Sequence, residues 1–269
     1  MGLLALVILL TMSVLLLGQR RVPLDDEYAR LTLVNDRINR AISNGQYREA
    51  LELATPHLKG GPSRIDEIPT PALLIQINAA EALYNLGRWD EALAVVPQAT
   101  PSNGPLIASG SACQRAWILT HLGRLNDAVR LAFLAKPWDL PSKWQAEIHF
   151  ARAVALMARG AYARAEKELA NADEVIERPS SERNALFLRA RLCVARGDLN
   201  AGDELFRAAA SHPYQGQGGD GLLAWGDCLA KLGRDEDAHR AWELAVQRDP
   251  QSESAGLARA RLGPVAARP

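Results

Sequence analysis

A short motif recurs at a nearly constant interval, and this recurrence constrains the fold more than any other feature of the sequence. Its six copies read GQYREA, GRWDEA, GRLNDA, GAYARA, GDLNAG and GRDEDA. They begin at Gly45, Gly87, Gly123, Gly160, Gly197 and Gly233, so successive copies are 42, 36, 37, 37 and 36 residues apart. A period of this length predicts a solenoid, in which each copy stacks on its neighbours.

The residues around each glycine predict two helices per period. The glycine itself is expected to end the first helix in a left-handed conformation, which a Cβ atom disfavours. Small residues recur seven positions before it, at Ala80, Ala116, Ala153, Ala190 and Gly226. A bulky residue follows two positions after it, at Tyr47, Trp89, Leu125, Tyr162 and Leu199. Three positions further on are Ala50, Ala92, Ala128, Ala165 and Ala238. We expect the small residues to let the two helices approach closely, and the bulky one to fill the wedge between them. Pro101, Pro137, Pro213 and Pro250 are expected to stop the second helices.

This helix–turn–helix pattern resembles the tetratricopeptide repeat over residues 31–250, which is most of the chain. The resemblance implies an all-α, right-handed superhelix of about six repeats. Three positions depart from the pattern, because His57 and Gly202 replace alanines and Asp235 replaces an aromatic residue. Residues 251–263 are predicted to form a capping helix, and residues 264–269 a tail.

The N-terminus carries an uncharged apolar run, GLLALVILLTMSVLLL, over residues 2–17. Its length predicts a transmembrane signal-anchor at residues 1–19, with residues 2–18 in the bilayer, followed by a linker at 20–30. A cleaved signal peptide is the alternative, but no basic residue precedes the run and Leu-Leu-Gly is a poor cleavage site. Arg20 and Arg21 follow the run, so the positive-inside rule places the repeats in the cytoplasm, with the periplasm as the alternative.

The remaining composition argues against several classes of function. Lysine plus arginine and aspartate plus glutamate number 31 each, so the chain lacks the positive surplus of a nucleic-acid binder. Cys113, Cys193 and Cys228 lie far apart without metal-ligand spacing, and each is expected to be a buried thiol. No catalytic or phosphate-binding motif is present. We therefore expect no enzyme activity, no metal and no cofactor.

The resemblance implies that one or more proteins or peptides bind in a concave groove lined by the first helix of each repeat. Placed on that geometry, the groove residues are Asn39, Tyr84, Asn85, Trp117, His121, Phe150, Met157, Phe187 and Arg191. Family members that bind Hsp70 or Hsp90 hold a carboxylate with several Lys, Arg and Asn residues. Apart from Asn39 and Arg191 that set is missing here, so we do not expect a co-chaperone of this type. Two long loops, at 60–71 and 211–221, are interpreted as spacers, although either could bind a partner.

The plan of a short anchor followed by tandem repeats is similar to that of the bacterial lipopolysaccharide assembly protein B family. Members of that family end in a metal module of CxxC pairs, which is absent from this chain. This similarity implies a single-pass inner-membrane adaptor that assembles or regulates an envelope or membrane complex. The alternative is a periplasm-facing assembly chaperone with the same fold.

Overall fold

A computed structural model describes residues 26–58, 70–98, 103–213 and 219–263 of the chain, except for the side chains of residues 143 and 144. Within these ranges the chain forms thirteen α-helices, one short 3-10 helix and no strand. The helices alternate as first and second members of six pairs. The pairs are α2 (Asp26–Ser43) with α3 (Tyr47–Leu58), α4 (Thr70–Asn85) with α5 (Trp89–Val95), α6 (Pro105–His121) with α7 (Leu125–Leu134), α8 (Ser142–Ala158) with α9 (Tyr162–Asp173), α10 (Pro179–Ala195) with α11 (Leu199–Ala210), and α12 (Gly219–Lys231) with α13 (Asp235–Arg248).

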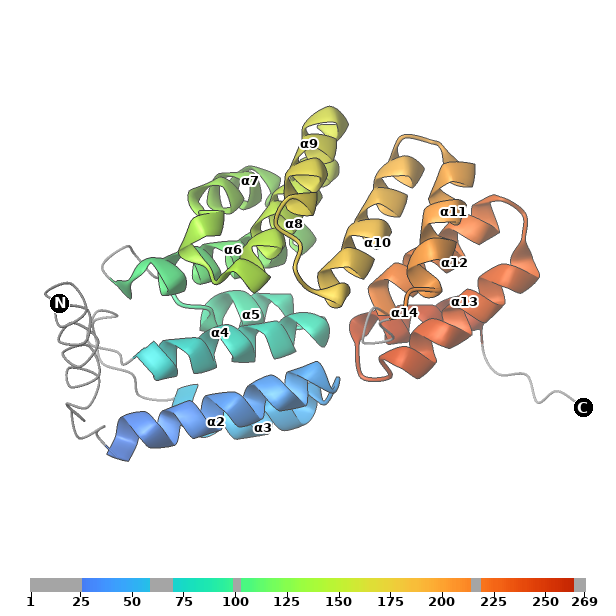
Figure 1. The fold of residues 1–269 in the computed structure, drawn as a ribbon. Helices are drawn as coiled ribbons and strands as arrows, with labels where there is room; N and C mark the ends of the chain where they lie inside the picture. The colour runs from blue at the N-terminus through green and yellow to red at the C-terminus, as the bar shows by residue number, and fades with distance from the viewer. Residues whose placement is uncertain (1–25, 59–69, 99–102, 214–218, 264–269) are drawn as a thin grey trace, which may run out of the picture.

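Two further elements accompany the pairs. The 3-10 helix η3 (Pro137–Asp139) connects α7 to α8, and α14 (Glu253–Leu262) packs on α12 and α13 at the C-terminal end. Each first helix contacts its own second helix and the first helix of the next pair. The pairs consequently follow one another along an arc, as Figure 1 shows. The all-helical prediction is confirmed for the part of the chain that the structure describes.

The motif glycines end the first helices as predicted. All six have positive φ, from 71° at Gly123 to 91° at Gly197. At Gly87 the backbone N–H donates to the carbonyl of Tyr84 at 3.0 Å, and the N–H of Arg88 donates to that of Leu83 at 2.9 Å. The same two bonds recur after each of the other five first helices. This is a Schellman cap, which satisfies carbonyls at the helix end and turns the chain towards the second helix.

Small residues lie where the paired helices cross. Ala80, Ala116, Ala153 and Ala190 are fully buried. Five alanines of the second helices are fully buried as well, namely Ala50, Ala92, Ala128, Ala165 and Ala238. Gly202, which departs from the pattern, has a packing reason: a Cβ atom there would lie 2.7 Å from Cγ2 of Val194. A close approach of helix axes therefore explains both the alanines and this glycine.

The helix boundaries differ from the predicted ones at four places. Helix α4 begins at Thr70 and α12 at Gly219, so each takes up the end of a predicted loop. Helix α2 begins at Asp26, so residues 26–30 are helical rather than linker. Asp26 and Glu27 occupy its first turn, where negative charge complements the helix dipole. Helix α5 ends at Val95, because Pro97 stops it before Pro101 is reached.

Several predicted segments lie outside the described residues. They are the signal-anchor at 1–19 with the linker up to residue 25, most of the loop at 60–71, part of the loop at 211–221, and the tail at 264–269. Among the helices that the structure does describe, none has the length and apolarity needed to cross a bilayer.

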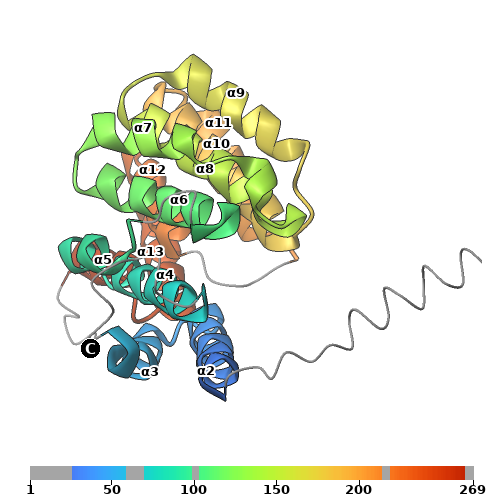
Figure 2. The ribbon, with the colours of Figure 1, turned by 90° about the vertical axis from the view of Figure 1, so that its left-hand side faces the viewer.

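The two ends of the arc meet. The hydroxyl of Tyr47, at the start of α3, donates a buried hydrogen bond of 2.9 Å to Oδ2 of Asp249, 202 residues later. The backbone N–H of Arg48 donates to Oε1 of Gln251 at 3.3 Å. A Cβ atom placed on Gly87 would lie 3.0–3.2 Å from the side chain of Glu253. Figures 1 and 2 show the same approach of α13 and α14 to the ends of the N-terminal helices. The first two repeats thus contact the loop between α13 and α14 and the first residue of α14.

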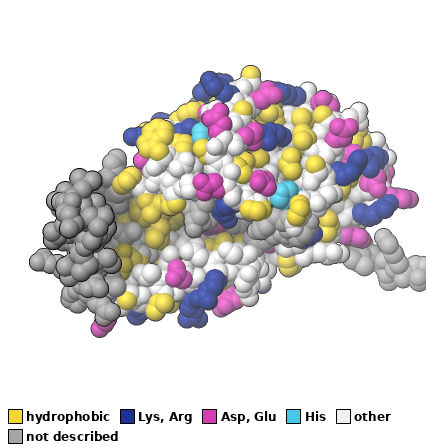
Figure 3. All heavy atoms as spheres, in the orientation of Figure 1, with side chains coloured by type: hydrophobic (Ala, Val, Ile, Leu, Met, Phe, Trp, Pro, Cys, Tyr) yellow, Lys and Arg dark blue, Asp and Glu magenta, His cyan; other side chains and the backbone are white. Residues whose placement is uncertain are grey.

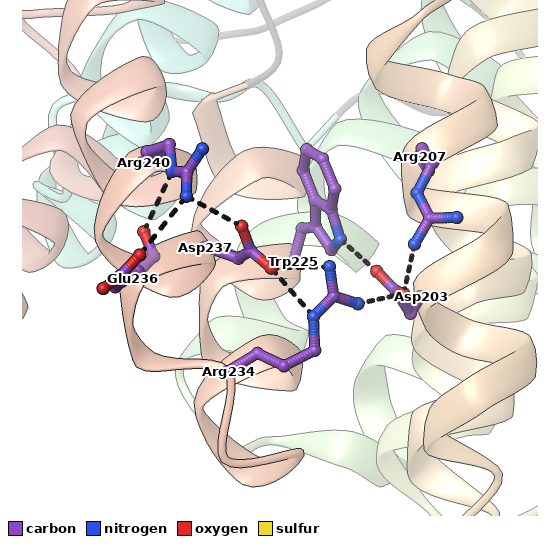
Figure 4. A network of polar contacts seen from close by, with 7 residues as sticks. All are labelled: Asp203, Arg207, Trp225, Arg234, Glu236, Asp237 and Arg240. Carbon is purple, nitrogen blue, oxygen red and sulfur yellow. Dashed lines mark hydrogen bonds and ion pairs between the residues drawn. The ribbon is translucent and has the colours of Figure 1, made fainter.

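A buried carboxylate joins the C-terminal pairs. Asp203 on α11 is only 6% exposed, and its carboxylate accepts hydrogen bonds from three side chains on three helices or turns. Arg207 and Arg234 each lie 2.6 Å from Oδ2, and Nε1 of Trp225 lies 2.8 Å from Oδ1 (Figure 4). Arg234 also pairs with Asp237 at 2.7 Å. The charge of this carboxylate is therefore fully matched by the surrounding protein.

Candidate protein-binding surface

Three aromatic side chains meet on the first helices of the second and third repeats. Trp117 and His121 are four residues apart on α6, so they share one face of that helix, and Tyr84 lies in the last turn of the adjacent α4. The Tyr84 and Trp117 rings pack edge to face with centroids 6.5 Å apart. The Tyr84 hydroxyl is 2.7 Å from Nε2 of His121. Tyr84 and Trp117 remain half-buried and His121 is exposed, so the cluster is open to solvent.

Two glutamates come from the helix that carries Tyr84 and from the first helix after α6. Glu81 is three residues before Tyr84 on α4, and Glu147 is on α8, where its backbone carbonyl accepts a bond from Sγ of Cys113 on α6. Burial raises the pKa of Glu81 to about 7, and the negative charge of Glu147 adds to this effect. Burial likewise raises the pKa of Glu147, against the opposing charge of Arg178 and a hydrogen bond from Ser181. We call the faces that carry Glu81, Tyr84, Trp117, His121 and Glu147 the inner surface.

Charged groups from the C-terminal repeats act on the inner surface. Burial raises the pKa of the Tyr84 phenol, and the carboxylates of Asp220 on α12 and Glu253 on α14 raise it further. His121 is exposed as a residue, but its imidazole packs against the rings of Tyr84 and Trp89, and this partial desolvation lowers its pKa. The positive charge of Arg191 on α10 lowers the pKa further. These helices are near Tyr84 and His121 because the arc closes on itself. Charges from both halves of the chain therefore act on the ionisation of Tyr84 and His121.

The structure brings together some of the predicted groove residues. Tyr84, Trp117 and His121 form the aromatic cluster. Asn85 follows on α4, where its side-chain amide donates to the backbone carbonyl of Glu81 at 2.9 Å. Arg191 is half-buried on α10. Asn39 is exposed on α2, and Met157 packs, partly buried, against the core between α8 and α10.

The prediction is wrong for two phenylalanines. Phe150 is 1% exposed and belongs to a core cluster that also contains residues of α9 and α10. Phe187 is 6% exposed, and the centroid of its ring lies 6.2 Å from the ring centroid of Phe206 on α11. Both rings fill the space between helices, because their positions on α8 and α10 face the neighbouring helices rather than the solvent. Neither is available to a partner.

Other residues of this region escaped the sequence reasoning. Arg178, Asp220 and Glu253 come from the starts of helices or from the loops before them, where the repeat pattern assigns no role. The sequence reasoning also missed Asn78, in the middle of α4. Its side-chain amide donates to Oδ1 of the buried Asn35 at 2.8 Å and links α4 to α2. Its position three residues before Glu81 on the same helix is the signal that could have identified it.

The three cysteines differ in burial. Cys113 and Cys228 are buried as predicted, and Cys193 is half-buried. Burial raises the pKa of all three thiols, which disfavours the nucleophilic thiolate. Within the described ranges, no three His, Cys, Asp or Glu side chains lie together in a way that could hold a metal ion.

Comparison with known proteins identifies the architecture. The chain matches no protein-family model and no curated protein sequence. Its structure is similar to that of a tetratricopeptide repeat protein from Parabacteroides merdae, with a TM-score of 0.58 and 14% identity over 91% of this chain and 86% of that one. It is less similar to PilW, a widely conserved type IV pilus biogenesis factor, with a TM-score of 0.49 and 18% identity over 84% of this chain and 97% of PilW. We base the assignment on the first of these, together with the six capped helix pairs. The described part of the chain has the tetratricopeptide-repeat fold.

Proposed function

We propose that this protein is a scaffold that binds segments of partner proteins on its inner surface. The observation that carries the proposal is the aromatic cluster of Tyr84, Trp117 and His121, which is open to solvent and surrounded by hydrogen-bonding groups. Tyrosine and tryptophan are enriched among the residues that contribute most to protein binding, because they bury a large area at low entropic cost. A half-buried cluster of this kind gains further burial when a peptide covers it.

We further propose that the scaffold is held at the bacterial inner membrane by residues 2–18 and serves the assembly or regulation of an envelope or membrane complex. The uncharged N-terminal run supports the anchor, and Arg20 and Arg21 support a cytoplasmic position for the repeats. The similarity of this plan to the lipopolysaccharide assembly protein B family supports the role in assembly. A periplasm-facing assembly chaperone is the alternative for the same fold.

Crosslinking and affinity capture of the full-length protein from membranes tests the binding surface. We compare wild type with Trp117→Ala and with His121→Ala, whose side chain is exposed and can be removed without disturbing the core. Trp138→Ala is the matched control, because that tryptophan is 73% exposed and lies on η3, outside the inner surface. A defined partner that is lost in both inner-surface variants and kept in the control supports the proposal. Equal capture by all four proteins contradicts it.

Labelling with a membrane-impermeant maleimide tests the orientation. Cys193 is half-buried and is first replaced by serine, while Cys113 and Cys228 are buried. A new cysteine is then placed at Glu174, which is exposed at the end of α9. Protection in intact cells, with labelling after lysis, is the expected result for a cytoplasmic domain. Labelling in intact cells with a permeable outer membrane would instead indicate the periplasm.

A further inference from the structure

Exposed apolar side chains gather at one edge of the repeat array. The first helices α2, α4 and α6 lie side by side and run in the same direction, so they begin at the same edge, as Figures 1 and 2 show. Helix α7 runs back from the far end of α6 and ends at this edge, where η3 follows it. Of the seven large apolar side chains that are exposed in the described part of the chain, five lie here. We call these five the apolar edge, and they are Tyr28, Leu106, Phe133, Leu134 and Trp138.

The exposure of Trp138 is a fixed feature of the fold, because the chain around it is held by two neighbouring helices. Ser109, near the start of α6, accepts a hydrogen bond of 3.2 Å from the backbone N–H of Lys136 and donates one of 2.6 Å to Oδ2 of Asp139. Arg152 on α8 donates to two backbone carbonyls at the end of α7, at 3.0 and 2.7 Å. Trp138 is nevertheless 73% exposed, so the fold presents its indole outward.

The part of the apolar edge around Trp138 carries little charge. Within residues 133–138 the one charged residue is Lys136, whose positive charge suits the phosphate groups of lipids. Figure 3 shows hydrophobic side chains gathered at the left of the view, whereas charges of both signs are mixed over its right-hand part. At the start of α2, Asp26 and Glu27 are exposed. Since charged side chains are costly in hydrocarbon, a lipid surface would contact the molecule most closely at Trp138.

The proposed anchor brings this edge within reach of the bilayer. Residues 2–18 are proposed to lie in the membrane and α2 begins at Asp26, so residues 19–25 connect the two. A connection of this length spans at most about 30 Å, even when fully extended. Packed helices lie about 8–10 Å apart, and α4 separates α6 from α2, so the start of α6 is roughly 20 Å from the start of α2.

The chemistry of the apolar edge matches the boundary between lipid headgroups and acyl chains. Tryptophan and tyrosine are enriched at this boundary, because their rings combine an apolar body with a polar group. The leucines and the phenylalanine add apolar area beside them. Because the anchor already holds the chain at the membrane, the contact is intramolecular in effect, and a small apolar area is enough to maintain it.

We propose that the apolar edge rests on the bilayer surface, with Trp138 and Leu134 inserted at the boundary between headgroups and acyl chains. This inference rests on the proposed anchor and adds a second contact that orients the repeats. Tyr84 and His121 lie in the last turns of α4 and α6, at the opposite edge. Since 15 residues of helix separate Leu106 from His121, the contact holds the aromatic cluster roughly 20 Å from the lipid.

Fluorescence quenching by a spin-labelled lipid tests the contact. The full-length protein with Cys193→Ser and Leu134→Cys carries a fluorescent label at position 134, which is 59% exposed. It is reconstituted into vesicles of phosphatidylethanolamine and phosphatidylglycerol that include a lipid with a nitroxide high on its acyl chain. The control is Asn126→Cys, which is exposed at the start of α7, about 12 Å further along the same helix. We expect the Leu134→Cys label to be quenched at least about twofold more strongly than the control label.

Two variants of the Leu134→Cys protein test the part played by the indole. Trp138→Ala should reduce the quenching at least about twofold, because it removes the largest side chain of the contact. Leu257→Ala removes an exposed apolar side chain from α14 and should leave the quenching unchanged. Trp138→Ala keeps the anchor and the inner surface, so its capture of a partner should equal that of wild type.

Flotation of the vesicles keeps this inference and the proposed anchor distinguishable. Protein that does not float with the vesicles would overturn both. Protein that floats, with equal quenching of the two labels, would overturn the edge contact and leave the anchor standing. Protection of the Leu134→Cys label from aqueous iodide, without quenching by the lipid, would also overturn it, because a protein surface such as a second copy would then cover the edge.

Discussion

Whether a side chain of a first helix faces a partner or the core depends on small differences in its angular position. Glu147 and Phe150 are three residues apart on α8 and would be assigned to the same face by periodicity. In the structure Glu147 is half-buried at the inner surface, whereas Phe150 is enclosed by α9 and α10. Trp117 on α6 combines the two situations. It packs, partly buried, against the core cluster, and its ring also contacts Tyr84 at the inner surface.

We predict that Phe150→Ala destabilises the fold rather than acting on partner binding alone. The ring is 1% exposed, so its loss leaves a cavity and should reduce the free energy of unfolding by about 3–5 kcal/mol. Denaturant unfolding of the full-length variant measures the change. His121→Ala, which removes an exposed ring, should leave stability nearly unaltered. A Phe150→Ala protein as stable as wild type would mean that the ring is not in the core.

At the scale of helices, adjoining elements are held by contacts that differ from one repeat to the next. Gly226 on α12 lies against the indole of Trp242 on α13, where a Cβ atom would be 2.3 Å from Nε1. The same indole donates to Oδ1 of Asp227 at 3.2 Å, which fixes its position. Asp203 on α11 instead makes polar contacts with Trp225 on α12 and with Arg234 just before α13, as Figure 4 shows.

Two glycine substitutions should have opposite effects on stability. Gly226→Ala should destabilise the protein by about 1–3 kcal/mol, because the Trp242 ring has to move. Gly256→Ala lies in α14, where nothing is within 4 Å of the added atom, and should stabilise by about 0.5–1 kcal/mol through helix propensity. Thermal unfolding followed by circular dichroism measures both. A neutral Gly226→Ala would show that the indole is not constrained by α12.

The Asp203 cluster makes a separate prediction. Asp203→Ala leaves the Trp225 indole without its acceptor and removes one ion pair each from Arg207 and Arg234, so it should cost about 2 kcal/mol of folding free energy. Asp237→Ala is the control, because Asp237 pairs with Arg234 and Arg240 in a more exposed position and should matter less. Urea unfolding of the two variants compares them. Equal losses would indicate that the burial of Asp203 adds nothing.

At the scale of the whole molecule, the contact between the first and last repeats decides what borders the inner surface. Tyr47 and Asp249 form its buried polar part, and burial together with the charge of Asp220 raises the pKa of Asp249 to about 6, although the bond from Tyr47 opposes this. An acid with a raised folded-state pKa binds more protons in the folded chain. Its contribution to stability is therefore largest at low pH and declines as pH rises through its folded pKa.

We predict that Asp249→Asn stabilises the protein at neutral pH and not in acid. The amide is neutral, and its oxygen can still accept the Tyr47 hydrogen bond. The gain over wild type should grow as pH rises from about 4 to about 6 and then level off. Denaturant unfolding across this range gives the difference, with the exposed Asp36→Asn as control. A gain independent of pH would mean that the Asp249 carboxylate is not buried at the closing contact.

The local architecture of this protein could be predicted from its sequence because each signal acts over a few residues. A glycine with positive φ ends the first helix in all six copies, with a small residue seven positions before it in five of them and an alanine five positions after it in five of them. These signals together specify six capped helix pairs. Tyr84, Trp117 and His121 could be placed on first helices for the same reason.

Only the tertiary structure decided which of these side chains remain open and what surrounds them. Phe150 and Phe187 are buried by neighbours from other helices, which no short-range pattern encodes. The approach of Asp220, Asp249 and Glu253 to the N-terminal repeats depends on the rotation between successive pairs, summed over the whole array. That rotation is set by packing at every interface between repeats, so a small change at each interface determines whether the first and last repeats meet.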